Sequence, residues 1–241
     1  MSTEGRVAGR PRQWQGPRVE QSRNMWDERV LFIDGEALVI DKPAGLAVHP
    51  GPKTEISLEA HLARLRFGFQ RPPTIVHRLD RDTSGCLLLA RNPKSHKRFQ
   101  QAFEAGLVEK SYVAIVEGIP ADEEGAIDMP LEKISSREAG WRIVPDPRGK
   151  AALTRWRKLA ERNGRAAILF TPETGRTHQL RVHAASGLGH PIAGDPVYGD
   201  GRGPMLLHAL SLSLAREGKA RIEAKAPLPP SFHHAGFGDV G

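Results

Sequence analysis

One segment of the chain combines a cluster of charged side chains with an uninterrupted apolar stretch. Residues 77–85 are His-Arg-Leu-Asp-Arg-Asp-Thr-Ser-Gly, and residues 86–90 are Cys-Leu-Leu-Leu-Ala. A short apolar run bounded by Gly and by Arg-Asn is typical of a buried strand. A loop that enters such a strand can hold a reactive side chain at a fixed place. The alternative is a solvated turn with surface ion pairs.

Apolar periodicity in the rest of the chain predicts more strands than helices. Strands are expected at 30–33, 37–40, 86–90, 110–116, 152–159, 166–171, 210–214 and 220–224. Helices are expected from a cap at Ser57, from Asn92-Pro93 to Gly106, and over about 178–186. Residues 120–150 are rich in Pro, Gly and charge, and their periodicity is weak. Adjacent strands are often hairpin-connected, which favours an α+β fold with a mixed, mainly antiparallel sheet flanked by helices and loops.

The two ends of the chain differ in composition from its middle. The first 25 residues carry five arginines against two glutamates, with Gly, Pro and Gln and almost no aliphatic residues. Such a composition predicts a disordered basic arm over 1–25. A single folded domain is expected over 26–235, followed by a flexible tail over 236–241.

Charge and cysteine usage narrow the class of protein. The net charge of +7 and the pI of about 9.8 favour an anionic partner, of which nucleic acid is the commonest. No apolar run approaches the roughly 18 residues of a membrane span, and no secretory signal is recognisable. Cys86 is the only cysteine, so no intrachain disulfide can form. A cytoplasmic location is the default expectation.

Two chemical interpretations fit the sequence poorly. Asp80-Arg81-Asp82-Thr83 invites comparison with aspartyl-phosphate enzymes, but their Asp-x-Asp-x-Thr spacing is missed by one residue. A metal site is equally unconvincing. His178 and His183 lie five residues apart, which on a helix separates their directions by about 140°, whereas helical ligand pairs use a spacing of four.

A third interpretation takes Asp80 as a nucleophile or base that acts on RNA without a metal or cofactor. An aspartate must be ionised for this role, and a nearby arginine such as Arg78 keeps it so. Arg181 and His178 lie three residues apart on the predicted helix and share a face. Tyr112, on a strand, can stack on a base. A half-buried strand tyrosine is the alternative for Tyr112.

Four stretches of the chain, in order, resemble the RluA family of RNA pseudouridine synthases. They are residues 38–50, 77–85, 110–114 and 174–183, and residues 189–199 and 207–209 continue the match. The similarity covers about 27–230. It implies the pseudouridine synthase fold and an isomerase that converts uridines in structured RNA, either ribosomal or transfer RNA, to pseudouridine. It implies no cofactor, no metal and no membrane partner, and a monomer is the default expectation.

The resemblance also implies roles for individual residues. Asp80 is the expected catalytic aspartate, Arg181 the arginine that pairs with it, and Tyr112 the ring that stacks on the uracil and assists proton removal. The target nucleotide must be flipped out of its stack to reach Asp80.

Four further residues are expected to contact the RNA. Arg78 would enter the space left by the flipped nucleotide, and Leu180 would pack the uracil pocket. Arg176 and His178 are placed near the site or the RNA backbone. Asp82, by contrast, is expected to be structural. The runner-up function is a non-catalytic RNA-binding or ribosome-assembly factor on the same fold.

The chain departs from some RluA-family members in its N-terminal segment. The first 26 residues are too short and too polar for the S4-type RNA-binding domain that those members carry. RNA recognition is therefore expected to rest on the catalytic domain and the arginine-rich arm.

Deleting residues 1–24 is expected to weaken RNA binding and to flatten its salt dependence. Each phosphate contact that is lost reduces the number of counterions released on binding. Titrations of RNA binding at several salt concentrations, with and without the segment, measure the slope. An unchanged slope would show that the arm does not contact the RNA.

Overall fold

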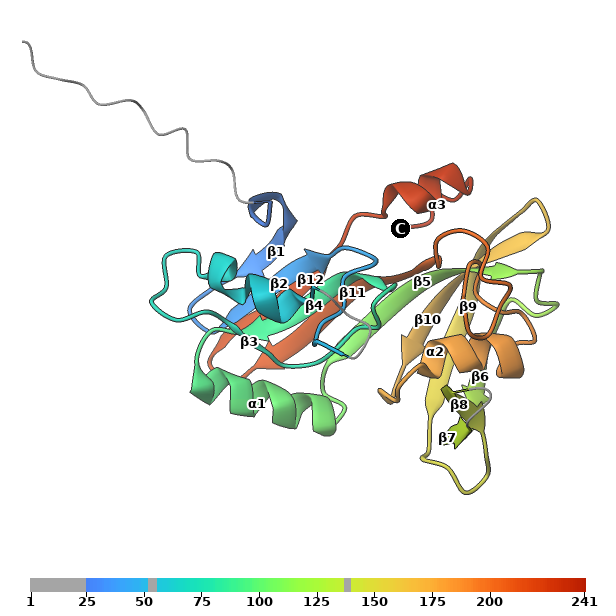
Figure 1. The fold of residues 1–241 in the computed structure, drawn as a ribbon, viewed down its shortest axis with the longest axis horizontal. Helices are drawn as coiled ribbons and strands as arrows, with labels where there is room; N and C mark the ends of the chain where they lie inside the picture. The colour runs from blue at the N-terminus through green and yellow to red at the C-terminus, as the bar shows by residue number, and fades with distance from the viewer. Residues whose placement is uncertain (1–24, 52–55, 137–139) are drawn as a thin grey trace, which may run out of the picture.

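The computed structural model describes residues 25–51, 56–136 and 140–241 (Figure 1). The arm expected over 1–25 lies outside the described residues except for Met25. The strands are β1 (Val30–Ile33), β2 (Ala37–Lys42), β3 (Thr74–Ile75), β4 (Ser84–Ala90), β5 (Glu109–Glu117), β6 (Glu124–Asp128), β7 (Leu131–Ser136), β8 (Gly140–Pro145), β9 (Leu153–Arg162), β10 (Arg165–Pro172), β11 (Leu207–Arg216) and β12 (Lys219–Lys225). The helices are α1 (Pro93–Glu104), α2 (Gln179–Val182), α3 (Pro230–His234), the 3₁₀ helices η1 (Asp27–Arg29) and η2 (Leu58–Leu65), and the π-helical turn η3 (His183–Gly187).

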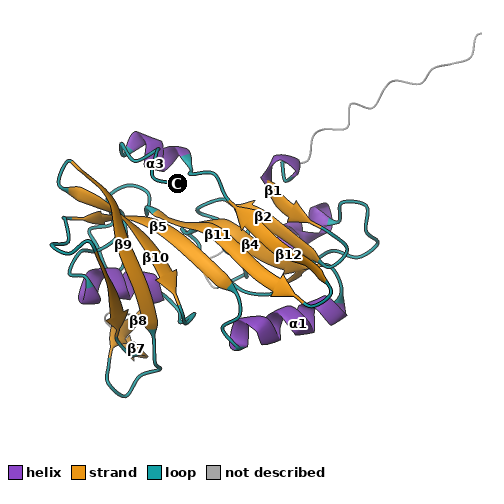
Figure 2. Ribbon diagram, turned by 180° about the vertical axis from the view of Figure 1, so that it is seen from behind, coloured by secondary structure: helices purple, strands orange, loops and turns teal. Residues whose placement is uncertain are grey.

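Ten of these strands form one long twisted sheet, seen from behind in Figure 2. Its order is β1-β2-β4-β11-β5-β10-β9-β6, with β12 paired to β11 and β3 to β4, while β7 and β8 form a separate hairpin. Among the pairings between these strands, only that of β4 with β11 is parallel in the described part of the chain. The expected α+β fold with a mixed, mainly antiparallel sheet is therefore confirmed. No helix in the described part of the chain is long and apolar enough to cross a membrane.

Strand β4 is buried along its whole length because both faces of the sheet are covered there. Leu88 points to the face that α1 covers with Phe99. Leu87 and Leu89 point to the opposite face, where η2 packs with Leu58. This two-sided burial explains why the strand has an unbroken apolar sequence instead of an alternating one.

The helix starts illustrate where local sequence decides structure. The Asn92 side chain accepts a hydrogen bond from the Ser95 N–H at 2.9 Å, and Pro93 occupies the first turn, so α1 begins where it was predicted. The segment after Ser57 forms a 3₁₀ helix instead of an α-helix, and the Ser57 side chain makes no capping bond.

Two parts of the chain differ from the sequence-based expectation. Residues 120–150 contain β6, β7 and β8, which were not predicted because few of their side chains are buried and no clear alternation results. The segment 236–241, expected to be a flexible tail, is packed instead. Phe237 is 1% exposed within an apolar cluster, and Asp239 forms an ion pair with Arg162 at 2.7 Å.

Gly85 lies where the charged loop joins β4, in direct contact with the neighbouring strand. Its φ of +103° lies in a region that L side chains rarely adopt. A Cβ built there would lie 2.2 Å from the carbonyl oxygen of Ala209, its partner on β11. Only glycine therefore allows the loop to enter β4 at this close approach.

Gly85→Ala is expected to lower the free energy of unfolding by at least about 2 kcal/mol, because it adds a backbone strain and a clash with Ala209. Urea denaturation followed by circular dichroism measures the change. Gly35→Ala is the matched control, since a Cβ added at Gly35 would have no heavy atom within 4 Å. Equal stability of the two variants would contradict the role given to Gly85.

Candidate active site

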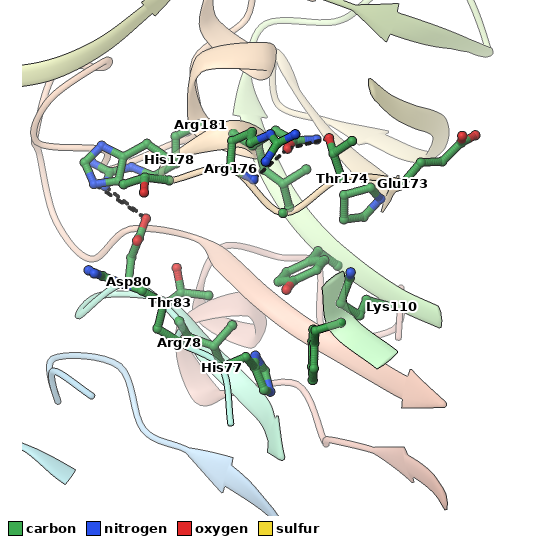
Figure 3. A pocket seen from close by; sticks show the side chains of 18 of the residues that line it. His77, Arg78, Asp80, Thr83, Lys110, Glu173, Thr174, Arg176, His178 and Arg181 are labelled. Carbon is green, nitrogen blue, oxygen red and sulfur yellow. Dashed lines mark hydrogen bonds and ion pairs between the residues drawn. The ribbon is translucent and has the colours of Figure 1, made fainter. Parts of the chain in front are cut away.

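The charged loop before β4 faces the segment that connects β10 to α2, and Tyr112 of β5 lies between them. A cavity of about 470 Å³ occupies this space. All seven residues predicted for the site line it: Asp80, Tyr112, Arg181, Arg78, Leu180, Arg176 and His178. Figure 3 shows Asp80 reaching from one wall toward His178 and Arg181 on the other. The structure thus brings together residues that are about a hundred positions apart in the sequence.

Arg181 bridges two carboxylates. Its Nη1 donates a hydrogen bond to Asp80 Oδ2 at 3.3 Å. Its Nε and Nη2 donate to the two carboxylate oxygens of Asp195, both at 2.7 Å. The expected contact with Asp80 is present, but the two shorter bonds, in the bidentate geometry typical of strong Arg–carboxylate pairs, are made with Asp195. Asp195 therefore fixes the guanidinium that Asp80 meets.

Asp195 was not among the predicted residues. It lies in the glycine-rich loop 189–203, and neither periodicity nor spacing distinguishes it there. Its side chain is fully buried and also accepts hydrogen bonds from the backbone N–H groups of Val197 and Tyr198. Burial raises the pKa of Asp195, but the bonds from Arg181 and the two N–H groups outweigh it, so the net shift lowers the pKa.

His178 is the second group beside Asp80. It has φ +54°, in the left-handed region just before α2, and its Nε2 lies 3.8 Å from Asp80 Oδ2. Burial lowers the pKa of His178, although the charge of Asp80 raises it, so the imidazole is neutral at pH 7. The Tyr198 hydroxyl accepts a bond from the Ile143 N–H at 3.0 Å and lies 2.9 Å from His178 Nδ1.

The two ring nitrogens of His178 face different partners. Nδ1 lies against the Tyr198 hydroxyl, and Nε2 lies on the side of Asp80. Because burial lowers its pKa, the ring is a neutral imidazole beside the carboxylate instead of a second cation.

The segment before α2 is held by Gln179, whose side chain satisfies all four of its hydrogen-bonding positions. Its Oε1 accepts from the Thr174 hydroxyl at 2.8 Å and from the Arg176 N–H at 2.9 Å. Its Nε2 donates to the Leu153 carbonyl at 3.1 Å and to the Thr154 hydroxyl at 2.9 Å. The turn is therefore anchored to β9, and the side chains that follow it are placed with little freedom.

Lys42 anchors the opposite wall. Its side chain is fully buried, and its ammonium donates to the carbonyls of Pro43 and Leu46, both at 2.8 Å, and of Arg81 at 3.1 Å. Burial lowers the pKa of Lys42 to about 8, although three nearby carboxylates raise it. The bond to Arg81 fixes the backbone directly after Asp80.

The remaining predicted residues form the floor and the mouth of the cavity. Leu180 is 8% exposed and packs in the same apolar cluster as Tyr112. Burial, with the charge of Asp80, raises the pKa of Tyr112, so the phenol is neutral at pH 7 and is not a base in this state. Arg78 and Arg176 are exposed at the mouth.

The second aspartate of the loop has a different environment. Asp82 forms an ion pair with its neighbour Arg81 at 3.0 Å on the surface. It does not line the cavity that Asp80 enters. The two aspartates of the charged loop thus have different surroundings.

Comparison with known proteins agrees with this geometry. A family model described as RNA pseudouridylate synthase matches residues 36–186. An uncharacterised RNA pseudouridine synthase of Zymomonas mobilis is 60% identical over 214 residues, which are 87% of this chain and 98% of that protein. The chain belongs to the RNA pseudouridine synthase family. It is accordingly an isomerase that acts on RNA.

Two further comparisons place the chain within the family. Ribosomal large subunit pseudouridine synthase C of Rickettsia bellii is 36% identical over 89% of this chain and 73% of that protein. The solved structure of human RNA pseudouridylate synthase domain containing 4 superposes with a TM-score of 0.72 at 27% identity, covering 86% of this chain and 91% of that one. The resemblance to the RluA family is confirmed.

Asp195→Asn is expected to lower the free energy of unfolding by about 3 kcal/mol, because it leaves the buried Arg181 charge without its main partner. Urea denaturation measures the loss. Asp200→Asn is the control from the same loop, where an exposed ion pair with Arg202 at 3.8 Å contributes little. If the two variants were equally stable, the buried pair would not organise the site.

Proposed function

We propose that this pseudouridine synthase isomerises specific uridines in structured RNA, either ribosomal or transfer RNA, with Asp80 as its catalytic aspartate and without a cofactor. The observation that carries the proposal is the position of the Asp80 carboxylate. It enters a cavity of single-nucleotide size between the Arg181 guanidinium and the neutral ring of His178.

The cavity suits a nucleotide that has left its stack. A base inside a helix cannot reach Asp80, so the uridine must be flipped into the pocket. There the uracil would lie against the Tyr112 ring, with Leu180 beside it. Arg78, exposed at the mouth, can fill the space from which the nucleotide came.

The proposed reaction conserves the atoms of the nucleoside. The N1–C1′ bond breaks, the uracil turns, and a C5–C1′ bond forms. C5 loses its hydrogen as a proton and N1 gains one, so no oxidant, reductant or phosphate donor is needed. Asp80 acts at the ribose, by attack on C1′ or by removal of the C2′ proton, and both routes require the ionised carboxylate.

The surroundings of Asp80 support that role. Arg181 donates a hydrogen bond to the Asp80 carboxylate, and Asp195 holds Arg181 in place so that it does not move to another partner. A charge-assisted contact that is already formed before the substrate arrives need not be reorganised during the reaction.

Asp80→Asn is expected to reduce isomerisation by about a thousandfold or more, on the scale of removing an essential acid–base or nucleophilic group, while RNA affinity is retained. Tritium release from RNA labelled at C5 of uridine measures the reaction, with RNA from a strain that lacks the protein as substrate. Asp82→Asn is the matched control, and it should retain most of the activity.

Separate assays with ribosomal and transfer RNA show which class is modified. RNA binding without tritium release from either class by the wild-type protein would favour the non-catalytic alternative. Release by Asp80→Asn at the wild-type rate would remove Asp80 from the mechanism.

A further inference from the structure

A second hollow of about 420 Å³ adjoins the active-site cavity. The two share four lining residues: Arg78, Gly175, Arg176 and Thr177. The rest of the second hollow is formed by the β7–β8 hairpin and the residue that pairs with its base: Leu131, Glu132, Lys133, Trp141, Ile143 and Lys150. The active-site cavity and the second hollow therefore share one wall, and the β7–β8 hairpin forms the opposite wall of the second hollow.

The hairpin register explains which side chains reach this hollow. Lys133 lies opposite Ile143 and Ser135 opposite Trp141, so Lys133, Ile143 and Trp141 share one face. Ile143 is 6% exposed and packs in the same cluster as Val182 of α2, which fixes this face toward the active site.

Trp141 is the exposed aromatic ring of this surface. The residue is 49% exposed, and its ring lies 5.1 Å from the His178 ring at an interplanar angle of 35°. The Lys133 ammonium lies 5.2 Å from the Trp141 ring centroid. The ring is thus held by two contacts beside the residue that faces Asp80, and about half of it is still open to a ligand.

The charges around Trp141 favour a polyanion. Four cations line the hollow, namely Arg78, Lys133, Lys150 and Arg176, against one acidic residue, Glu132. In the described part of the chain, no ion pair is found for any of these four cations. An exposed aromatic ring among uncompensated cations is the pattern that binds single-stranded nucleic acid, whose bases stack and whose phosphates pair with Lys and Arg.

We propose that the second hollow holds the RNA nucleotide next to the flipped uridine, with its base stacked on Trp141 and its phosphates against Lys133, Lys150 and Arg176. This inference rests on the proposed function. A uridine in the first cavity is joined to its neighbours by phosphodiester bonds, and the adjoining hollow lies directly across the shared wall, within reach of one neighbour. The neighbouring nucleotide is then unstacked from the uridine, and Trp141 replaces that lost stacking.

The stack is tested by RNA binding in the Asp80→Asn protein, so that turnover does not enter the measurement. The probe is a short, fluorescently labelled single-stranded RNA with one central uridine, and anisotropy gives its affinity. Adding Trp141→Ala should weaken binding about tenfold, whereas Trp141→Phe should restore most of it. Ile134→Ala is the control, because Ile134 is an exposed apolar residue on the other face of the same hairpin.

The phosphate contacts are tested by the salt dependence of the same binding. Lys133→Ala and Lys150→Ala should each reduce the slope of log affinity against log salt by about 0.7, the value expected for one phosphate of a single strand. Arg142→Ala, an exposed cation on the other face of the hairpin, should leave the slope unchanged.

RNAs that lack the base on one or the other side of the uridine complete the test. One of these two RNAs should bind weakly to the Asp80→Asn protein, and adding Trp141→Ala should not weaken its binding further. Unchanged affinity of the Trp141→Ala protein, or an equal loss with both abasic RNAs, would overturn the stack.

Tritium release by the wild-type protein separates the two proposals. Release without any effect of Trp141 on affinity would overturn the stack and leave the isomerase function intact. Absence of release, together with a Trp141-dependent affinity, would overturn the catalytic proposal and leave the stack as an RNA-binding feature.

Discussion

The organisation of the site depends on one guanidinium that is shared by two carboxylates. Arg181 comes from α2, Asp80 from the loop before β4, and Asp195 from the loop before β11. A carboxylate as deeply buried as Asp195 is costly unless it is paired, and the bidentate pair with two added N–H donors satisfies it. Because Asp195 occupies two of the guanidinium nitrogens, Arg181 meets Asp80 with the third, in one direction only.

The sheet and two buried polar side chains hold the walls on either side of this bridge. Lys42 ties the loop around Asp80 to the turn after β2, and Gln179 ties the segment before α2 to β9. Each of these side chains makes at least three hydrogen bonds, so moving either wall would leave buried polar groups without partners. The cavity is therefore formed largely in advance of the substrate.

The sequence was informative wherever local rules or burial dominate. The apolar run after Gly85 and the Asn92-Pro93 start of α1 could be recognised directly, and the family resemblance indicated residues that share one cavity. Asp195 could not be assigned a role, because its partner is set by tertiary folding of a glycine-rich loop. Strands β6 to β8 were missed for another reason. Most of their residues are exposed, so their sequences do not alternate between apolar and polar residues.

The hairpin that was hardest to predict is also linked to the active site by a continuous chain of contacts. The Ile143 N–H donates to the Tyr198 hydroxyl, that hydroxyl reaches His178 Nδ1, and Nε2 of the same ring faces Asp80. Trp141 lies two residues from Ile143 on the same strand, and its ring contacts the ring of His178. A shift of the hairpin would therefore move the His178 ring that faces Asp80, so the element proposed to contact the neighbouring nucleotide is also connected to the carboxylate proposed to act on the ribose.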